Sequence, residues 1–591
     1  MGYAGKFAAV SKAVPLGKVS SPQAMTEGVP PSRLPPQVKI ASYGKKDYTI
    51  KKRCGVRPAG QDAGDETMKR RDFCKGLAVT FAAGTLAPAA ALPQAGAATA
   101  LVGRAVPDDY YTLWYRSDRC GADLRHDYYY SDSLFDHPAT EYDNQLALAT
   151  LGMAAAADCT WESDQRYWME GEVGRADHIR DAFAKLGFTE VQLFNYTHSL
   201  NDTPDTVGCA IARKTLVRGG RQVTIIGAFL RGSGYGAEWS GNLHAGPGSA
   251  HVGFVTAARQ LVEKIRAYVQ ASAKRQPLGT LKLWMGGYSR GGGVANLVAA
   301  RLPAVLPQLE KKNTFVYTFA APASLTAADC PDLQQDYDNN HAADGSLKKN
   351  WGTSNIFNIV SSGDVIPRIL PAEWGFYRNG NDRFLPSTVI PEELQALNDR
   401  SAGMEGTPMD FGRLAVSEET DAVLRSMLDL FCDRQTYYKG YEDAMRCMLQ
   451  CATTRTEEEV TRGIVRDDAA VVAQLRSMEL MQRFPQEKVE RCVQAASALS
   501  RPVLEKLGSA VPLQAQQIVI PMLAVGLCFE LQPETVQLVA DFVLSTITVK
   551  GQLSGILKTV LCHFQENYIT VLEAYDPADH GMTPYTRREE L

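Results

Sequence analysis

The stretch "LKLWMGGYSRGGGVANLVAA", residues Leu281–Ala300, decides the fold of this 591-residue chain. An apolar run ends in glycines, a single serine follows, and a small-residue segment of helical composition begins at Arg290. Residues 287–291 read G-x-S-x-G, and between a strand and a helix this pattern indicates a nucleophile elbow, with Ser289 exposed at the strand end. Glycines on either side let the strand and the helix approach without Cβ clashes. We also expect Gly292 and Gly293 to leave room for a substrate carbonyl.

Strands and helices alternate around this elbow. The segment Gly253–Lys274 has the apolar spacing of an amphipathic helix. Short apolar runs predict strands at residues 207–217, 221–232, 281–287, 313–322 and 354–364. This alternation predicts an α/β fold of the α/β-hydrolase type, in which helices flank a mostly parallel sheet.

Near residue 385 the sequence changes from alternating strands and helices to helices alone. We use this change to divide the chain after residue 100 into three regions. We predict a hydrolase core over residues 101–385 and a large helical insertion or cap over residues 386–555, where helical periodicity follows helical periodicity. Residues 556–591 form a C-terminal segment.

The N-terminal hundred residues have a different character. From Met68 the chain reads "MKRRDFCKGLAVTFAAGTLAPAAALPQAGAATA", with the pair Arg70-Arg71, an alanine-rich apolar run and the small-residue site Ala95-Gly96-Ala97. Residues 68–100 resemble a twin-arginine export signal, so we expect a periplasmic or extracellular protein. The alternative, a membrane anchor, is disfavoured by the glycines and prolines of the run. Residues 1–67 are basic and proline-rich, and we predict a disordered extension or a misassigned start ahead of Met68.

Charge and cysteine content exclude several classes of function. Residues 1–97 hold 15 of the 62 Lys and Arg and 6 of the 66 Asp and Glu, so the remainder has 47 basic and 60 acidic residues. An acidic chain argues against a nucleic-acid partner. The cysteines, twelve in all, show no zinc-type spacing, so we expect neither metal nor organic cofactor and leave paired and free thiols open.

An elbow serine needs an imidazole to take its proton and a carboxylate to hold the imidazole. In this fold the chain order is serine, acid, histidine. Asp364 ends the predicted strand of "NIFNIVSSGDVIP" and is the candidate acid. Of the nine histidines only His563 and His580 come later, and spacing alone does not choose between them.

The oxyanion of the reaction needs hydrogen-bond donors beside the serine. Ser233, in the "RGSG" that follows a predicted strand, offers its backbone N–H and its hydroxyl. The backbone N–H of Arg290, the residue after the nucleophile, is the second candidate donor.

Five motifs appear in an order that resembles the class 3 (fungal-type) lipases and secreted bacterial proteins of that family. They are "FLRGSGYGAEWSGNL", "AHVGF", "GGYSRGGGVANLVAA", "NIFNIVSSGDVIPRI" and "WGFYRNG", preceded by "YYYSDSLF". The resemblance implies that Ser289 is the nucleophile, that Asp364 orients the base, and that Ser233 and Arg290 line the oxyanion hole. "HFQENYITVL" is similar to the family's histidine with a tyrosine five residues on, which favours His563 over His580. The chain departs from the compact fungal members by about 200 residues between Asp364 and His563.

These features predict an exported serine esterase or lipase that cleaves carboxylic esters through an acyl-enzyme. Lipid is the substrate class that the resemblance implies, together with transient contact with a lipid surface. Acyl transfer or peptidase activity on the same triad, and an inactive binding protein on a hydrolase scaffold, are the alternatives.

Overall fold

The computed structural model describes most of the chain between residues 103 and 574. The described residues are 103–117, 122–158, 171–172, 176–198, 204–233, 236–247, 250–326, 353–361, 364, 366–368, 370, 374–385, 433–454, 459, 462–508, 513–536 and 562–574. The chain divides into two units, Met1–Pro93 and Gln94–Leu591, and all described residues belong to the second. The predicted extension (1–67) and export signal (68–100) lie outside the described residues, as do residues 386–432.

A seven-stranded sheet forms the centre of the second unit. Its strand order is β13-β11-β9-β8-β7-β6-β4. The strands are β4 Thr189–Phe194, β6 Cys209–Arg218, β7 Arg221–Leu230, β8 Thr280–Tyr288, β9 Thr314–Phe319, β11 Ile356–Ser361 and β13 Asn381–Leu385. The five strands from β13 to β7 pair in parallel, while β6 pairs antiparallel with both neighbours. The prediction of a mostly parallel sheet is confirmed.

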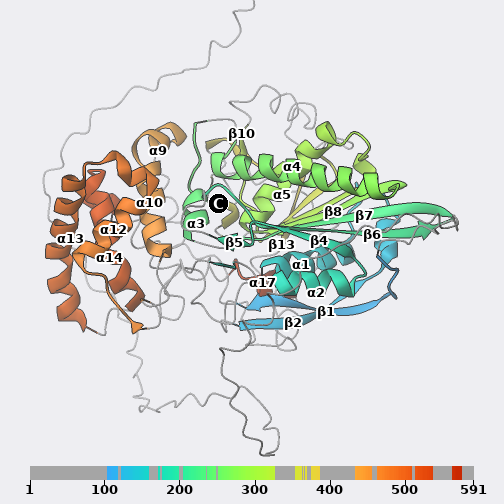
Figure 1. Ribbon diagram of the computed structural model, residues 1–591, viewed down its shortest axis with the longest axis horizontal. Helices are drawn as coiled ribbons and strands as arrows, with labels where there is room; N and C mark the ends of the chain where they lie inside the picture. Colours follow the sequence, from blue (N-terminus) through green and yellow to red (C-terminus); the bar gives the residue numbers. More distant parts are fainter. Residues whose placement is uncertain are drawn as a thin grey trace, which may run out of the picture. The chain divides into compact units, whose positions relative to one another are not determined.

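Helices cover both faces of this sheet (Figure 1). One face carries α4 (Val252–Arg275) and α5 (Arg290–Val305), and the other carries α1 (Asn144–Asp158) and α2 (Ala176–Lys185). Because side chains alternate along a strand, neighbouring residues of β7 enter different cores. Ile226 and Ala228 pack with α4 and α5, whereas Phe229 packs with α1 and α2. Both faces are therefore buried, as parallel strands require.

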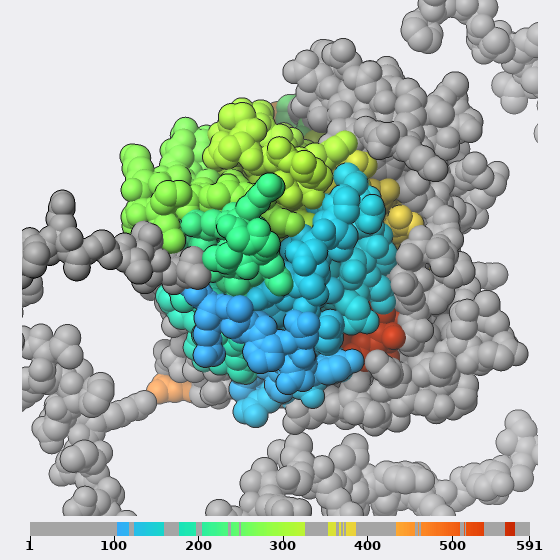
Figure 2. Space-filling view, turned by 90° about the vertical axis from the view of Figure 1, so that its right-hand side faces the viewer, coloured from blue at the N-terminus to red at the C-terminus, as the bar shows by residue number. Residues whose placement is uncertain are grey.

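The sequence reading missed a strand hairpin at the N-terminal side. Strands β1 (Asp109–Ser117) and β2 (Ala122–Tyr130) pair antiparallel within a Tyr/Asp-rich stretch. The hairpin packs against α1 and against α17 (Gln565–Ala574), and Figure 2 shows its blue atoms near the red atoms of α17. His126 Nε2 lies 2.6 Å from Glu573 Oε1, and the Ser117 hydroxyl donates to Glu566 Oε1 at 3.0 Å. The hairpin thus braces the helix that follows His563.

The described residues from 433 to 536 form helices and turns, as the helical periodicity predicts. The helices are α9 Arg434–Gly440, α10 Glu442–Thr453, α12 Asp468–Ser477, α13 Gln486–Leu507 and α14 Leu513–Cys528. None of the described helices is both long enough and apolar enough to span a bilayer.

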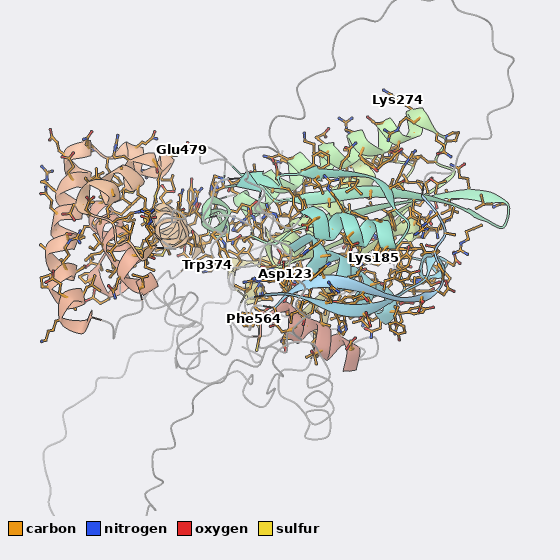
Figure 3. The ribbon with its side chains drawn as sticks, turned by 60° about the horizontal axis from the view of Figure 1, so that its bottom comes forward. Asp123, Lys185, Lys274, Trp374, Glu479 and Phe564 are labelled. Atoms are coloured by element: carbon orange, nitrogen blue, oxygen red, sulfur yellow. The ribbon has the colours of Figure 1, made fainter. Side chains whose placement is uncertain are left out.

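Buried polar contacts attach this helical region to the core. Glu442 Oε2 accepts the Gly246 N–H at 2.8 Å, and Arg434 Nε donates to the Gly246 carbonyl at 3.0 Å. Trp374, labelled in Figure 3, lies with its ring 5.3 Å from that of Tyr437. The two hydrogen bonds to Gly246 hold α9 and α10 against the loop after α3 (Gly236–Gly241). The exact boundaries proposed for the three regions stay predictions.

Cysteines of the described part are free thiols. They are Cys209, Cys447, Cys451, Cys492, Cys528 and Cys562. Burial raises the pKa of Cys447 to about 12, so this thiol is un-ionised and unreactive at neutral pH.

Candidate active site

The turn between β8 and α5 has the geometry of a nucleophile elbow. Ser289 adopts φ 54° and ψ −126°, a conformation that costs a non-glycine residue about 1–3 kcal/mol. A hydrogen bond of 2.9 Å from its N–H to the Phe319 carbonyl helps to hold it. A Cβ on Gly287 would lie 2.5 Å from Gly291 backbone atoms, and one on Gly291 would lie 2.4 Å from the Leu230 carbonyl oxygen. Both positions of the motif therefore require glycine, as predicted.

The expectation for the next two glycines is wrong. A Cβ on Gly292 would meet Ala321 and the Phe319 carbonyl at 3.0 Å, and one on Gly293 would meet the Phe254 ring at 3.3 Å. These residues are small because α5 packs closely on β9 and α4. They do not make room for a substrate.

Ser289, His563 and Asp364 form one hydrogen-bonded chain. His563 Nε2 lies 2.9 Å from Ser289 Oγ, and its Nδ1 lies 2.8 Å from Asp364 Oδ2. The Asp364 side chain is fully buried, whereas the His563 side chain is 20% exposed. The two contacts join residues 274 and 199 positions apart in the sequence. The structure thus brings together the three residues that the resemblance selects, while His580 lies outside the described residues.

Two tyrosines fix this chain of residues in place. Tyr288 donates to the His563 carbonyl at 2.8 Å, which ties the segment before α17 to the elbow. Tyr568 donates to Asp364 Oδ2 at 2.8 Å and accepts the Ser361 N–H at 3.0 Å. Burial, with the charge of Asp364 as a lesser cause, raises the pKa of Tyr568 well above its usual value of 10. Tyr568 therefore stays a hydrogen-bond donor to the carboxylate at any working pH.

Asp364 also makes hydrogen bonds within its own loop. The side-chain Oδ1 accepts the Ile366 N–H at 2.9 Å, and the backbone N–H of Asp364 donates to the Ser361 carbonyl at 3.0 Å. With three donors on one buried carboxylate, the charged form is well satisfied. Such a carboxylate can orient the imidazole and stabilise its protonated form.

Ser233 and Arg290, the candidate oxyanion residues, are linked by a residue that the sequence reading missed. Asn242 donates from Nδ2 to Ser233 Oγ at 2.9 Å and accepts from Arg290 Nη1 at 2.8 Å. The Ser233 hydroxyl hydrogen is left to donate elsewhere, because its oxygen acts as acceptor here. Arg290 is the first residue of α5, whose N-terminal amides carry the positive end of the helix dipole.

The Arg290 side chain is itself a buried structural group. It donates to the carbonyls of Thr206 and Pro204 at 3.0 and 2.9 Å. Its guanidinium carbon lies 5.1 Å from the centre of the Phe254 ring. The guanidinium is therefore occupied by hydrogen bonds and packing within the fold. Of Arg290, only the backbone N–H is suited to bind an oxyanion.

His251, the histidine of "AHVGF", caps α4 and supports Asn242. Its Nδ1 accepts the Phe254 N–H at 3.3 Å, and its Nε2 lies 2.9 Å from the Asn242 carbonyl, to which it donates. Burial, aided by the charge of Arg290, lowers the pKa of His251 well below its usual 6.5. The neutral imidazole is thus the form that fits, with one nitrogen accepting and the other donating.

We expect His251 to make the fold labile to mild acid. Below pH 6.5 the unfolded chain binds a proton at this residue while the folded chain does not. The free energy of unfolding should therefore fall as pH drops, by up to about 1.4 kcal/mol per pH unit from this group. Urea unfolding between pH 7.5 and 5 measures the slope. His251→Gln keeps an acceptor and a donor without the titration and should show a smaller slope; equal slopes would contradict the assignment.

No cluster of metal-ligating side chains occurs among the described residues. The site just described is a set of hydrogen-bonded protein groups. Such a set suits nucleophilic attack by an activated hydroxyl.

Comparisons with known proteins give a family match and similar solved structures. Residues 233–374 match the family model described as lipase (class 3). Among solved structures, the chain is similar to a lipase of Rhizomucor miehei in complex with its propeptide, at 21% identity over 41% of this chain and 68% of that chain, with a TM-score of 0.28. It is also similar to lipase II from Rhizopus niveus, at 18% identity over 41% of this chain and 80% of that chain, with a TM-score of 0.28. A search of curated proteins found no match.

The family match includes both Ser289 and Asp364, and His563 lies beyond its end. The similarity to the class 3 lipase family therefore covers residues 233–374 of this chain.

Proposed function

We propose that this protein hydrolyses lipid esters through an acyl-enzyme formed on Ser289, with His563 as base and Asp364 as the acid that orients it. The match of residues 233–374 to the class 3 lipase model supports hydrolysis of carboxylic esters. The proposed triad and acyl-enzyme are supported by the continuous contact from Ser289 Oγ through His563 to Asp364, at 2.9 and 2.8 Å.

In the proposed reaction the proton positions follow from these contacts. His563 Nδ1–H donates to Asp364, so Nε2 is free of hydrogen and takes the Ser289 proton as Oγ attacks the ester carbonyl carbon. The carbonyl oxygen becomes an oxyanion, which the Arg290 N–H and Ser233 stabilise. Protonated His563 then gives its proton to the departing alcohol. Water, deprotonated in turn by His563, releases the carboxylic acid and restores Ser289.

A fluorophosphonate probe and an ester assay test this proposal together. We expect the folded full chain to be labelled and to release fatty acid from a triacylglycerol emulsion. Assays with added alcohol or amine, and with a peptide, report acyl transfer and peptidase activity as different products. A folded chain that takes no label and cleaves no ester contradicts the proposal and favours a binding protein on the same scaffold.

We further propose that the chain is exported through its twin-arginine segment. The support is the order of Arg70-Arg71, the alanine-rich run and Ala95-Gly96-Ala97. In a bacterial host with a twin-arginine pathway, we expect export and an exported N-terminus at Ala98 by N-terminal sequencing. Arg70→Lys with Arg71→Lys should keep the chain inside the cell at full length. Export that survives this double substitution contradicts the assignment.

A further inference from the structure

A carboxylate outside the triad connects two parts of the proposed site. Asp158 is the last residue of α1. Its Oδ1 accepts the N–H of Gly232 at 2.6 Å, and its Oδ2 accepts from Gln565 Nε2 at 2.8 Å. Gly232 directly precedes the candidate oxyanion residue Ser233, and Gln565 lies two residues after the candidate base His563. One side chain therefore joins the oxyanion loop to the histidine segment.

The backbone of the oxyanion loop is shaped to receive this carboxylate. A Cβ on Gly232 would lie 2.7 Å from Asp158 Oδ1 and 3.2 Å from its Oδ2. Residue 232 must therefore be glycine for the carboxylate to approach the amide. Since Asn242 holds the Ser233 hydroxyl, the loop is fixed from two directions, by Asp158 on the backbone and by Asn242 on the side chain.

Gln565 is fixed in one orientation by its second contact. Its Oε1 accepts the N–H of Arg116, at the end of β1, at 3.2 Å, and the glutamine side chain is buried. The amide must then present Nε2 to Asp158. If the amide turned round, Nε2 would face the Arg116 N–H, donor against donor.

We propose that Asp158 is a positioning residue that sets the distance between the oxyanion loop and the His563 imidazole. The proposal rests on the proposed ester hydrolysis and concerns which residues keep its transition-state contacts aligned. Asp158 acts through Gly232 and Gln565. A displacement of about 1 Å in a catalytic group is enough to lower a rate by about a hundredfold.

Exchanging the carboxylate of residue 158 and the amide of residue 565 tests the contact between these two side chains. In Asp158→Asn, the new Nδ2 faces Gln565 Nε2, and both are donors. In Gln565→Glu, two carboxylates face each other. With both substitutions, the new amide donates to the new carboxylate, while Gly232 and Arg116 each keep an acceptor. The pair and its total charge are then restored with the roles reversed.

We expect each single variant to lose about tenfold to a hundredfold in kcat for a soluble ester, with KM changed by less than about twofold. The double variant should recover to within about threefold of wild type. Asp181→Asn removes a carboxylate of the same type from an exposed ion pair with Lys185 and serves as the control, with kcat unchanged. Rates are taken per folded molecule, and the melting temperature is recorded for each variant.

Loss of kcat in the single variants with recovery in the double variant supports the positioning role. Wild-type kcat per folded molecule in Asp158→Asn, or no recovery in the double variant, overturns it. Since Gln565→Glu breaks the same contact from the other side, failure of one single variant to fold does not prevent the comparison. An inactive wild type overturns the proposed hydrolysis itself, whereas an active wild type with normal single variants overturns only the role of Asp158.

Discussion

Replacing Ser289 by alanine is expected to lower kcat for ester hydrolysis by at least about a thousandfold and to abolish fluorophosphonate labelling. The Oγ atom, 2.9 Å from His563 Nε2, is the group that forms the acyl-enzyme in the proposed reaction. Without it no covalent intermediate forms, and the residual rate depends on substrate binding and the oxyanion donors alone.

The variant should fold like the wild type. Serine already occupies a strained backbone conformation at φ 54°, and alanine carries the same Cβ there. Ser289 is only partly buried, so removal of its hydroxyl leaves no large cavity. An unchanged melting temperature with lost activity is the expected pair of results. Label that survives in Ser289→Ala would identify another nucleophile.

Replacing His563 by alanine is expected to lower kcat by roughly a thousandfold or more, while His580→Ala leaves it near wild type. His563 contacts both Ser289 and Asp364, so its loss removes the base and leaves the Asp364 carboxylate buried without that donor. The two variants remove the same ring from the same C-terminal part of the chain, which makes them matched.

The comparison of the two variants identifies the base. The reverse pattern, with large losses in His580→Ala and near-normal turnover in His563→Ala, would reassign the base.

Local features of the sequence were sufficient for the central part of the fold. The apolar runs at residues 207–217 and 221–232 predicted β6 and β7, and the periodicity of residues 253–274 predicted α4. The hairpin β1–β2 escaped because its strands are rich in tyrosine and charged residues without a clear apolar pattern, and their burial depends on α1 and α17. The periodicity of a short segment does not reveal a packing partner as distant in the chain as α17.

The polar residues around the site likewise divide into those that the sequence marks and those that only the folded structure reveals. Ser289 and Asp364 stand at strand ends in motifs that the sequence displays directly. Asn242 lies within the quoted stretch "FLRGSGYGAEWSGNL", but nothing in that stretch singles it out, and Asp158 ends an alanine-rich helix outside the quoted motifs. Their importance comes from hydrogen bonds to Ser233 and Gly232, which are seen only once the chain has folded.

The sequence by itself determined the elbow and the mostly parallel sheet, because these depend on glycine sterics and on short apolar runs between helices. The order of the candidate triad followed from the fold type that these features predict. Only the tertiary structure brought His563 to Ser289 and tied its segment to the oxyanion loop. Those contacts join residues hundreds of positions apart. The physical reason is that hydrogen bonds act over about 3 Å in space, and local sequence does not encode which distant segments come that close.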